Sequence, residues 1–148
     1  MTFPPPVPQA AGYAGEITPE QAWRRLSEDA TARLVDVRTQ AEWSFVGVPD
    51  LSSLNRQPLL VSWQVFPSMG RNDAFADQIA ELGVDKNDVI LLLCRSGVRS
   101  KAAAEHLTSL GYRSCWNVTD GFEGPHDEAR HRGVKAGWKA SGLPWAQG

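Results

Sequence analysis

The chain has 148 residues, 42% of them hydrophobic and 22% charged, which is the composition of an ordinary folded domain with its own core. The formal net charge of −2 gives no basic surface, so nucleic acid is not an expected partner. Two cysteines are too few for a disulfide scaffold and lack zinc-ligand spacing. No apolar stretch is long enough for a membrane span and the first residues do not have the pattern of a secretion signal, so we expect a cytoplasmic protein.

The chain begins with a proline-rich stretch. Residues 1–12 contain four prolines and show no hydrophobic periodicity, which predicts a disordered or extended arm. No internal repeat is visible in the remainder. We therefore expect residues 13–148 to form one domain.

A helix and a strand are expected next. Thr18 begins a capping box, which predicts a helix through about Glu28. Residues 33–37 then predict a buried strand that ends near Asp36. Charged residues at the carboxyl end of a parallel strand lie at the edge where open α/β sheets bind ligands. We interpret Asp36 and Arg38 as an ion pair that orders the loop after this strand.

Three further elements are predicted in the middle of the chain. Thr39 has the position of a cap for a short helix through Trp43. Residues 59–63 predict another strand, and Asn72 is expected to cap a helix. The buried face of that helix is expected to consist of Phe75, Ile79 and Leu82.

Residues 89–100 carry the clearest pattern in the chain. Residues 89–93 are all apolar, which predicts a strand buried on both faces. From Arg99 the pattern changes to that of a helix that ends at Gly111. Its expected buried stripe is Ala103, Leu107 and Leu110. A short loop that begins with Cys94 joins the strand to the helix.

This loop places the sulfur of Cys94 at the carboxyl end of a central strand, opposite a helix N-terminus. Backbone N–H groups and the positive end of the helix dipole converge there, so the position is suited to an anion. The same field, together with Arg95 and Arg99, stabilises the thiolate form of a cysteine. We interpret Cys94 as a nucleophilic thiolate; the alternative is a core cysteine that merely ends a strand.

The loop 94–99, Cys-Arg-Ser-Gly-Val-Arg, resembles the active-site loop of the rhodanese family of sulfurtransferases, in its single-domain form. The similarity extends over about residues 16–145, and further matches are residues 34–38, Glu42, Trp43, Gly47 and residues 142–144. The strand–helix alternation, like this resemblance, predicts an α/β, rhodanese-like fold: a parallel sheet of four or five strands with helices on both faces.

The resemblance implies a sulfurtransferase that needs no cofactor and no metal. Cys94 would take a sulfane sulfur from thiosulfate or a similar donor, hold it as a persulfide and pass it to cyanide, a thiol or a protein acceptor. Asp36 and Arg38 would support the site. The substrate-binding residues would be those of the loop, namely Arg95, Ser96, Gly97, Val98, Arg99 and Ser100. For Arg99, pairing with an acid such as Asp36 is an alternative to binding the donor.

Other readings of the same residues stay open. Cdc25-type phosphatases and arsenate reductases have a loop one residue longer, and the shorter ring of amides here fits a sulfur atom better than a tetrahedral phosphate. A persulfide carrier or docking module for a partner protein is compatible with every residue named above. Cys115 is either a resolving thiol for Cys94 or a buried structural residue, of which we favour the second.

Two stretches, residues 48–75 and 125–137, depart from the family pattern. They are either surface elaborations or parts of the rim of the site, where they would suit an acceptor larger than cyanide. The candidate rim residues are Trp63, Phe66, Met69, His126 and Arg130. His126 and His131 are five residues apart, a spacing that disfavours a shared metal ion.

Overall fold

The computed structural model describes residues 12–65, 70–95, 97–119, 121–123, 137–139 and 141–146. Its centre is a five-stranded sheet in which every neighbouring pair of strands is parallel. Across the sheet the order is β1 (Gly15–Ile17), β8 (Ser114–Val118), β7 (Val89–Leu93), β2 (Arg33–Asp36) and β4 (Leu59–Leu60). The predicted parallel α/β fold is confirmed. The arm predicted over residues 1–12 lies, apart from Gly12, outside the described residues.

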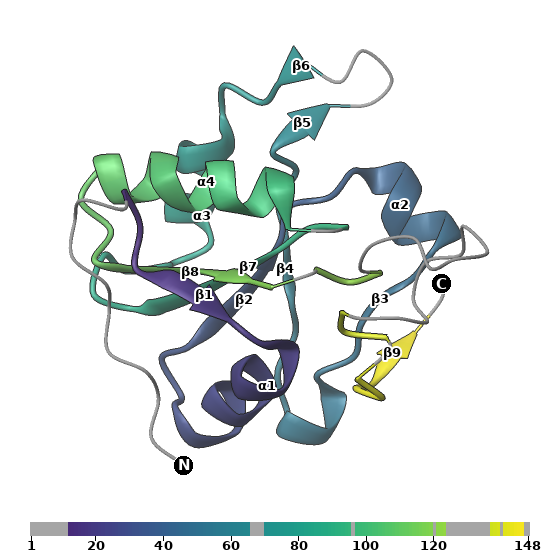
Figure 1. Cartoon of the computed structure of the whole chain (residues 1–148). Coiled ribbons are helices and arrows are strands. Elements are labelled where there is room, and N and C mark those ends of the chain that lie inside the picture. The colour runs from purple at the N-terminus through teal and green to yellow at the C-terminus, as the bar shows by residue number, and fades with distance from the viewer. Residues whose placement is uncertain are drawn as a thin grey trace.

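Helices cover both faces of this sheet (Figure 1). On one face lies α1 (Pro19–Glu28), and on the other lie α3 (Phe75–Glu81) and α4 (Val98–Ser109). A hydrophobic core lies on each face of the sheet, and β7 contributes side chains to both cores because successive side chains of a strand point to opposite faces. Ile90 and Leu92 join the core under α3 and α4, and the other three residues join the core under α1. All five are buried, as their apolar run predicts.

The first helix begins as its sequence predicts. The Thr18 side chain accepts a hydrogen bond from the Gln21 N–H, and the Gln21 side chain accepts one from the Thr18 N–H, which completes a capping box. Ala22 and Leu26 are buried against the sheet. Trp23 is only partly buried and contacts the edge of Trp138, with ring centroids 6.0 Å apart.

Smaller elements surround the sheet. Helix α2 (Gln40–Phe45) follows β2, and Ser52–Leu54 forms one turn of 3-10 helix. Strand β3 (Val48–Pro49) pairs antiparallel with β9 (Trp145–Ala146), which holds the end of the described chain beside the segment after α2. The hairpin of β5 (Gln64–Val65) and β6 (Gly70–Arg71) stands out beyond α4 (Figure 1).

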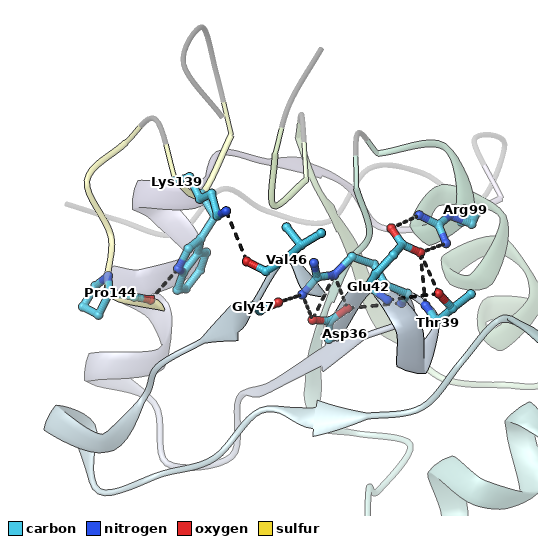
Figure 2. Close-up of polar contacts among 10 residues, drawn as sticks. Asp36, Thr39, Glu42, Val46, Gly47, Arg99, Lys139 and Pro144 are labelled. Atoms are coloured by element: carbon cyan, nitrogen blue, oxygen red, sulfur yellow. Dashed lines mark hydrogen bonds and ion pairs between the residues drawn. The ribbon is translucent and has the colours of Figure 1, made fainter. Parts of the chain in front are cut away.

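Two polar contacts reinforce the β3–β9 junction (Figure 2). The Lys139 ammonium donates to the carbonyl of Val46 at 3.3 Å, and the indole N–H of Trp138 donates to the carbonyl of Pro144 at 2.7 Å. The Lys139 ammonium also lies 3.9 Å from the centre of the Trp145 ring. Segments about 90 residues apart in sequence are thus held together next to the carboxyl end of β2.

The prediction that Leu82 and Leu110 are buried in the core is wrong. Leu82 is 45% exposed and Leu110 is 43% exposed. Each is the C-cap residue just after its helix, α3 or α4, where the backbone leaves the helical path. The period of 3.6 residues therefore no longer decides which way the side chain points.

The segment before α3 is less regular than predicted. Only Leu59 and Leu60 of the predicted strand 59–63 form β4, although the N–H groups of Val61 and Trp63 still donate to β2 and to the residue after it. Asn72 is not the cap of α3; its side-chain oxygen accepts from the N–H of Ala74 in the preceding turn. Within the described residues, no helix is both long and apolar enough to cross a membrane.

Candidate active site

Cys94 directly follows the central strand β7, and two polar groups of the described residues lie next to its sulfur. The N–H of Gly97 donates to the sulfur at 3.1 Å, and the hydroxyl of Ser100 lies 3.2 Å from it. Helix α4 begins at Val98, so the sulfur also lies at the positive end of a twelve-residue helix. Cys94 is only 1% exposed. The Gly97 N–H and the helix dipole both stabilise negative charge on this sulfur.

Gly97 gives the loop its shape. Its φ of +105° lies in the left-handed region, which a residue with a side chain adopts only with strain. The residue is held at both ends, because its N–H faces the sulfur while its carbonyl accepts from the side chain of Asn117 at 3.0 Å. Ser96, the neighbour before it, lies outside the described residues.

The turn after β8 holds the start of the loop. The N–H of Phe122 donates to the carbonyl of Cys94 at 2.7 Å, and the N–H of Glu123 donates to the carbonyl of Arg95 at 3.0 Å. Gly121 has a φ of +62°, and a Cβ there would lie 2.3 Å from the Cys94 carbonyl oxygen, so only glycine fits. This turn was not predicted to contact the loop, although the composition Asp-Gly-Phe-Glu-Gly of residues 120–124 is typical of a turn.

Arg99 is paired with an acid, as the alternative interpretation held, but that acid is Glu42 of α2 and not Asp36. Two hydrogen bonds of 2.7 and 2.9 Å join the guanidinium to the carboxylate (Figure 2). Burial opposes both charges, but the mutual hydrogen bonds and charges prevail, lowering the pKa of Glu42 and raising the pKa of Arg99. The Glu42 carboxylate also accepts from the N–H and hydroxyl of Thr39, the predicted cap of α2.

Asp36 and Arg38 form the predicted ion pair, and both are fully buried. The closest contact, 2.6 Å, joins Arg38 Nη2 to Asp36 Oδ2. The same nitrogen donates to the carbonyl of Gly47 at 2.7 Å (Figure 2). The guanidinium carbon lies 4.2 Å from the centre of the Phe122 ring. Since the N–H of Phe122 also donates to the Cys94 carbonyl, this ring connects the ion pair to the start of the loop 94–99.

The remaining described loop residues differ in exposure. Arg95 is exposed, and no ion pair to it is found in the described part of the chain. Val98 is 76% exposed. Ser100 is fully buried, and its hydroxyl lies 2.5 Å from the side-chain oxygen of Asn117. The surface of the loop thus presents one cation and one apolar side chain.

Cys115 lies too far from Cys94 to act as its resolving thiol in this fold. It pairs across the sheet with Ile90, four residues before Cys94, which corresponds to about 13 Å along the strand. Cys115 is fully buried, and burial raises the pKa of its thiol to about 12. The structure therefore agrees with the interpretation of Cys115 as a structural residue.

The predicted rim is only partly covered by the described residues. The prediction that Trp63 lines the rim is wrong, because its side chain is only 9% exposed. Its ring packs on those of Phe75 and His106, with ring centroids 5.2 and 5.5 Å apart. The other candidates, Phe66, Met69, His126 and Arg130, lie outside the described residues, as do residues 125–136. Among the residues that are described, no three His, Cys, Asp or Glu side chains are grouped to hold a metal ion.

Comparison with known proteins places this geometry in a family. Residues 14–148 match the family model described as "STR4 middle domain". The chain belongs to this family. It is 40% identical over 126 residues to an uncharacterized protein, the RP600 homolog of Rickettsia rickettsii, and the match covers 84% of this chain and 91% of the relative. The crystal structure of Rv0390 from M. tuberculosis matches with a TM-score of 0.82 and 49% identity, over 92% of this chain and 99% of that one.

More distant matches give the fold and the type of domain. A rhodanese-like domain protein from Staphylococcus aureus has a TM-score of 0.57 at 23% identity, over 90% of this chain and 99% of that one, which shows a shared fold. The thiosulfate sulfurtransferase GlpE of Actinobacillus pleuropneumoniae is 29% identical over 129 residues, which cover 87% of this chain and 90% of that enzyme. The predicted rhodanese resemblance is confirmed, and the chain is a rhodanese-like domain of the sulfurtransferase type.

Proposed function

We propose that this rhodanese-like domain transfers a sulfane sulfur from thiosulfate or a similar donor to a thiophilic acceptor through a persulfide on Cys94. The observation that carries the proposal is the Cys94 sulfur at the head of α4, with the Gly97 N–H donating to it at 3.1 Å. This arrangement stabilises negative charge on sulfur before and after the transfer. The similarity to GlpE supports thiosulfate as the first donor to test.

The first step forms the persulfide. The Cys94 thiolate attacks the outer sulfur of thiosulfate, and the sulfur–sulfur bond of the donor breaks. The bonding electron pair leaves with sulfite, so the negative charge of the thiolate passes to the outer sulfur of the new persulfide. No proton is transferred and no external oxidant is needed.

The second step returns the enzyme to its starting state. Cyanide in an assay, or a thiolate, attacks the outer persulfide sulfur, and the electron pair of the broken bond returns to Cys94. The products are thiocyanate or a persulfide of the acceptor. A partner protein with an accessible thiol is a further acceptor class that fits the same chemistry.

The two arginines of the loop have different parts in this proposal. Arg99 is neutralised by Glu42, so it fixes α2 against α4 more than it binds a free anion. Arg95 is exposed and is the described loop residue suited to attract an anionic donor. Donor binding should therefore depend on salt and on Arg95.

Two measurements on the wild-type protein test the proposal. Intact mass after one equivalent of thiosulfate should show the addition of one sulfur atom, and cyanide should then remove it with formation of thiocyanate. A persulfide that forms but turns over small acceptors slowly would favour the alternative of a carrier for a partner protein. Hydrolysis of a phosphate ester, without persulfide formation, would overturn the proposal.

A further inference from the structure

Asn117, near the end of β8, has every polar group of its amide engaged. The residue is 3% exposed. Its nitrogen donates to the carbonyl of Gly97 at 3.0 Å and to the Glu16 carboxylate at 3.0 and 3.1 Å. Its oxygen lies 2.5 Å from the hydroxyl of Ser100. Gly97 and Ser100 are, among the described residues, the two whose polar groups face the Cys94 sulfur.

The partners of Asn117 fix the direction of these hydrogen bonds. A carbonyl and a carboxylate can only accept, so the amide nitrogen faces Gly97 and Glu16 and the amide oxygen faces Ser100. The Ser100 hydroxyl then donates to Asn117 and turns a lone pair to the sulfur, where it can accept the proton of a Cys94 thiol. Once the thiol has ionised, the hydroxyl can rotate to donate to the sulfur anion.

We propose that Asn117 is a positioning residue for the reaction of Cys94, holding the Gly97 peptide and the Ser100 hydroxyl against the sulfur, and that Glu16 in turn holds Asn117. Gly97 shows the mechanism most directly, because its carbonyl is bound by Asn117 while its N–H reaches the sulfur. The proposal rests on the proposed function in taking Cys94 as the reacting group.

Glu16 is a suitable anchor because it is bound from several sides. The Tyr13 hydroxyl donates to it at 2.5 Å and the Thr119 hydroxyl at 3.2 Å. Burial, with the bond to Glu16 and its charge, raises the pKa of Tyr13 to about 12, so Tyr13 remains a donor at neutral pH. The other described charged groups around the loop include Arg95, Arg99, Glu42, Asp36, Arg38 and Glu123.

The test compares Asn117→Leu and Asn117→Asp with Thr119→Val as the matched control. Thr119→Val removes the longest hydrogen bond to Glu16, 3.2 Å, and leaves those from Tyr13 and Asn117 to hold the carboxylate. All variants carry Cys115→Ser, so that iodoacetamide reports on Cys94 alone. The rate of alkylation is measured against pH, and the rate of persulfide formation from thiosulfate is measured at neutral pH.

We expect Asn117→Leu to slow persulfide formation about 10- to 100-fold, as the loss of an aligned donor at a charged centre does elsewhere. The midpoint of its alkylation profile should move to higher pH, because the Gly97 N–H is no longer held against the sulfur through the Gly97 carbonyl. Asn117→Asp should move it further, because a second carboxylate beside Glu16 opposes the thiolate. Thr119→Val should match the parent protein in both measurements.

The structural alternative predicts a different result. If Asn117→Leu or the nearly isosteric Asn117→Asp lowers thermal stability but keeps the parent midpoint and rate, Asn117 serves the fold alone and the proposal is overturned. If Asn117→Leu does not fold, the alkylation profile and the persulfide rate of Asn117→Asp decide between the two roles. Alkylation needs no sulfur donor, so a shifted profile in a protein that never forms a persulfide would refute the proposed function and leave the positioning role intact.

Discussion

Cys94 and Cys115 lie on or next to neighbouring strands, face the same core and are both almost fully buried. Only Cys94 lies at the carboxyl end of its strand, where a turn and a helix N-terminus bring the Gly97 N–H and the Ser100 hydroxyl close to the sulfur. Cys115 lies within β8, where burial outweighs a hydrogen bond with Thr108 and raises the pKa of the thiol to about 12. The two cysteines thus differ in the surroundings of the sulfur rather than in burial, because only Cys94 has a backbone N–H and a helix N-terminus beside it.

The largest effect should come from the nucleophile. Cys94→Ser should abolish persulfide formation and thiocyanate production while the protein remains folded, because the two side chains are similar in size. Intact mass after addition of thiosulfate, with circular dichroism as the control for folding, measures this. Wild-type activity in Cys94→Ser would show that Cys94 is not the nucleophile and does not differ from Cys115 in this way.

The next effect should come from the donor geometry. Gly97→Val forces a side chain onto a residue with a φ of +105° and should turn its N–H away from the sulfur. We expect kcat to fall about 100-fold with little change in KM. Steady-state assays with thiosulfate and cyanide separate the two constants, and a change confined to KM would contradict the role of this N–H.

A smaller effect is expected from the exposed cation. Arg95→Ala should raise KM for thiosulfate about 5- to 10-fold and leave kcat nearly unchanged, because Arg95 attracts the donor without touching the stabilised charge. Added salt should mimic the variant in the wild-type protein. The control is Arg113→Ala, which removes an exposed cation just before β8 begins, at the opposite end of the sheet from the loop.

Loss of the Arg99–Glu42 ion pair should mainly lower the stability of the fold. A carboxyl group whose pKa is lowered on folding stabilises the fold above its unfolded pKa, and this contribution is lost as pH falls through the folded value. Glu42→Gln should therefore lower the free energy of unfolding by about 1–2 kcal/mol at pH 7. The difference from wild type should shrink below about pH 4. Urea titrations at several pH values test this, and a pH-independent difference would contradict it.

The smallest effect should come from the other cysteine. Cys115→Ser should keep most sulfur-transfer activity and cost about 1 kcal/mol of stability, because a hydroxyl replaces a buried thiol. Thiocyanate production and a melting curve measure both. A variant that gains one sulfur atom but fails to release it would assign Cys115 a resolving role after all.

The short elements show where sequence patterns stop being informative. Strand β1 was not predicted, because three residues are too few for a recognisable alternation, and it exists through its pairing with β8. The two-residue strands β3 and β9 likewise depend on a partner about 100 residues away. Leu82 and Leu110 continue an apolar stripe in sequence but lie past the end of their helices.

The sequence by itself determined the central strand, the following helix, the cysteine between them and the Asp36–Arg38 pair, because each depends on residues that are near one another in the chain. Tertiary structure alone decided that Glu42 takes up the charge of Arg99, and that Gly121 touches the start of the loop. It also decided that Asn117 joins Glu16 to the groups around the sulfur. These partners are 17 to 101 residues apart in sequence, so only the order and register of the parallel strands bring them within hydrogen-bond distance.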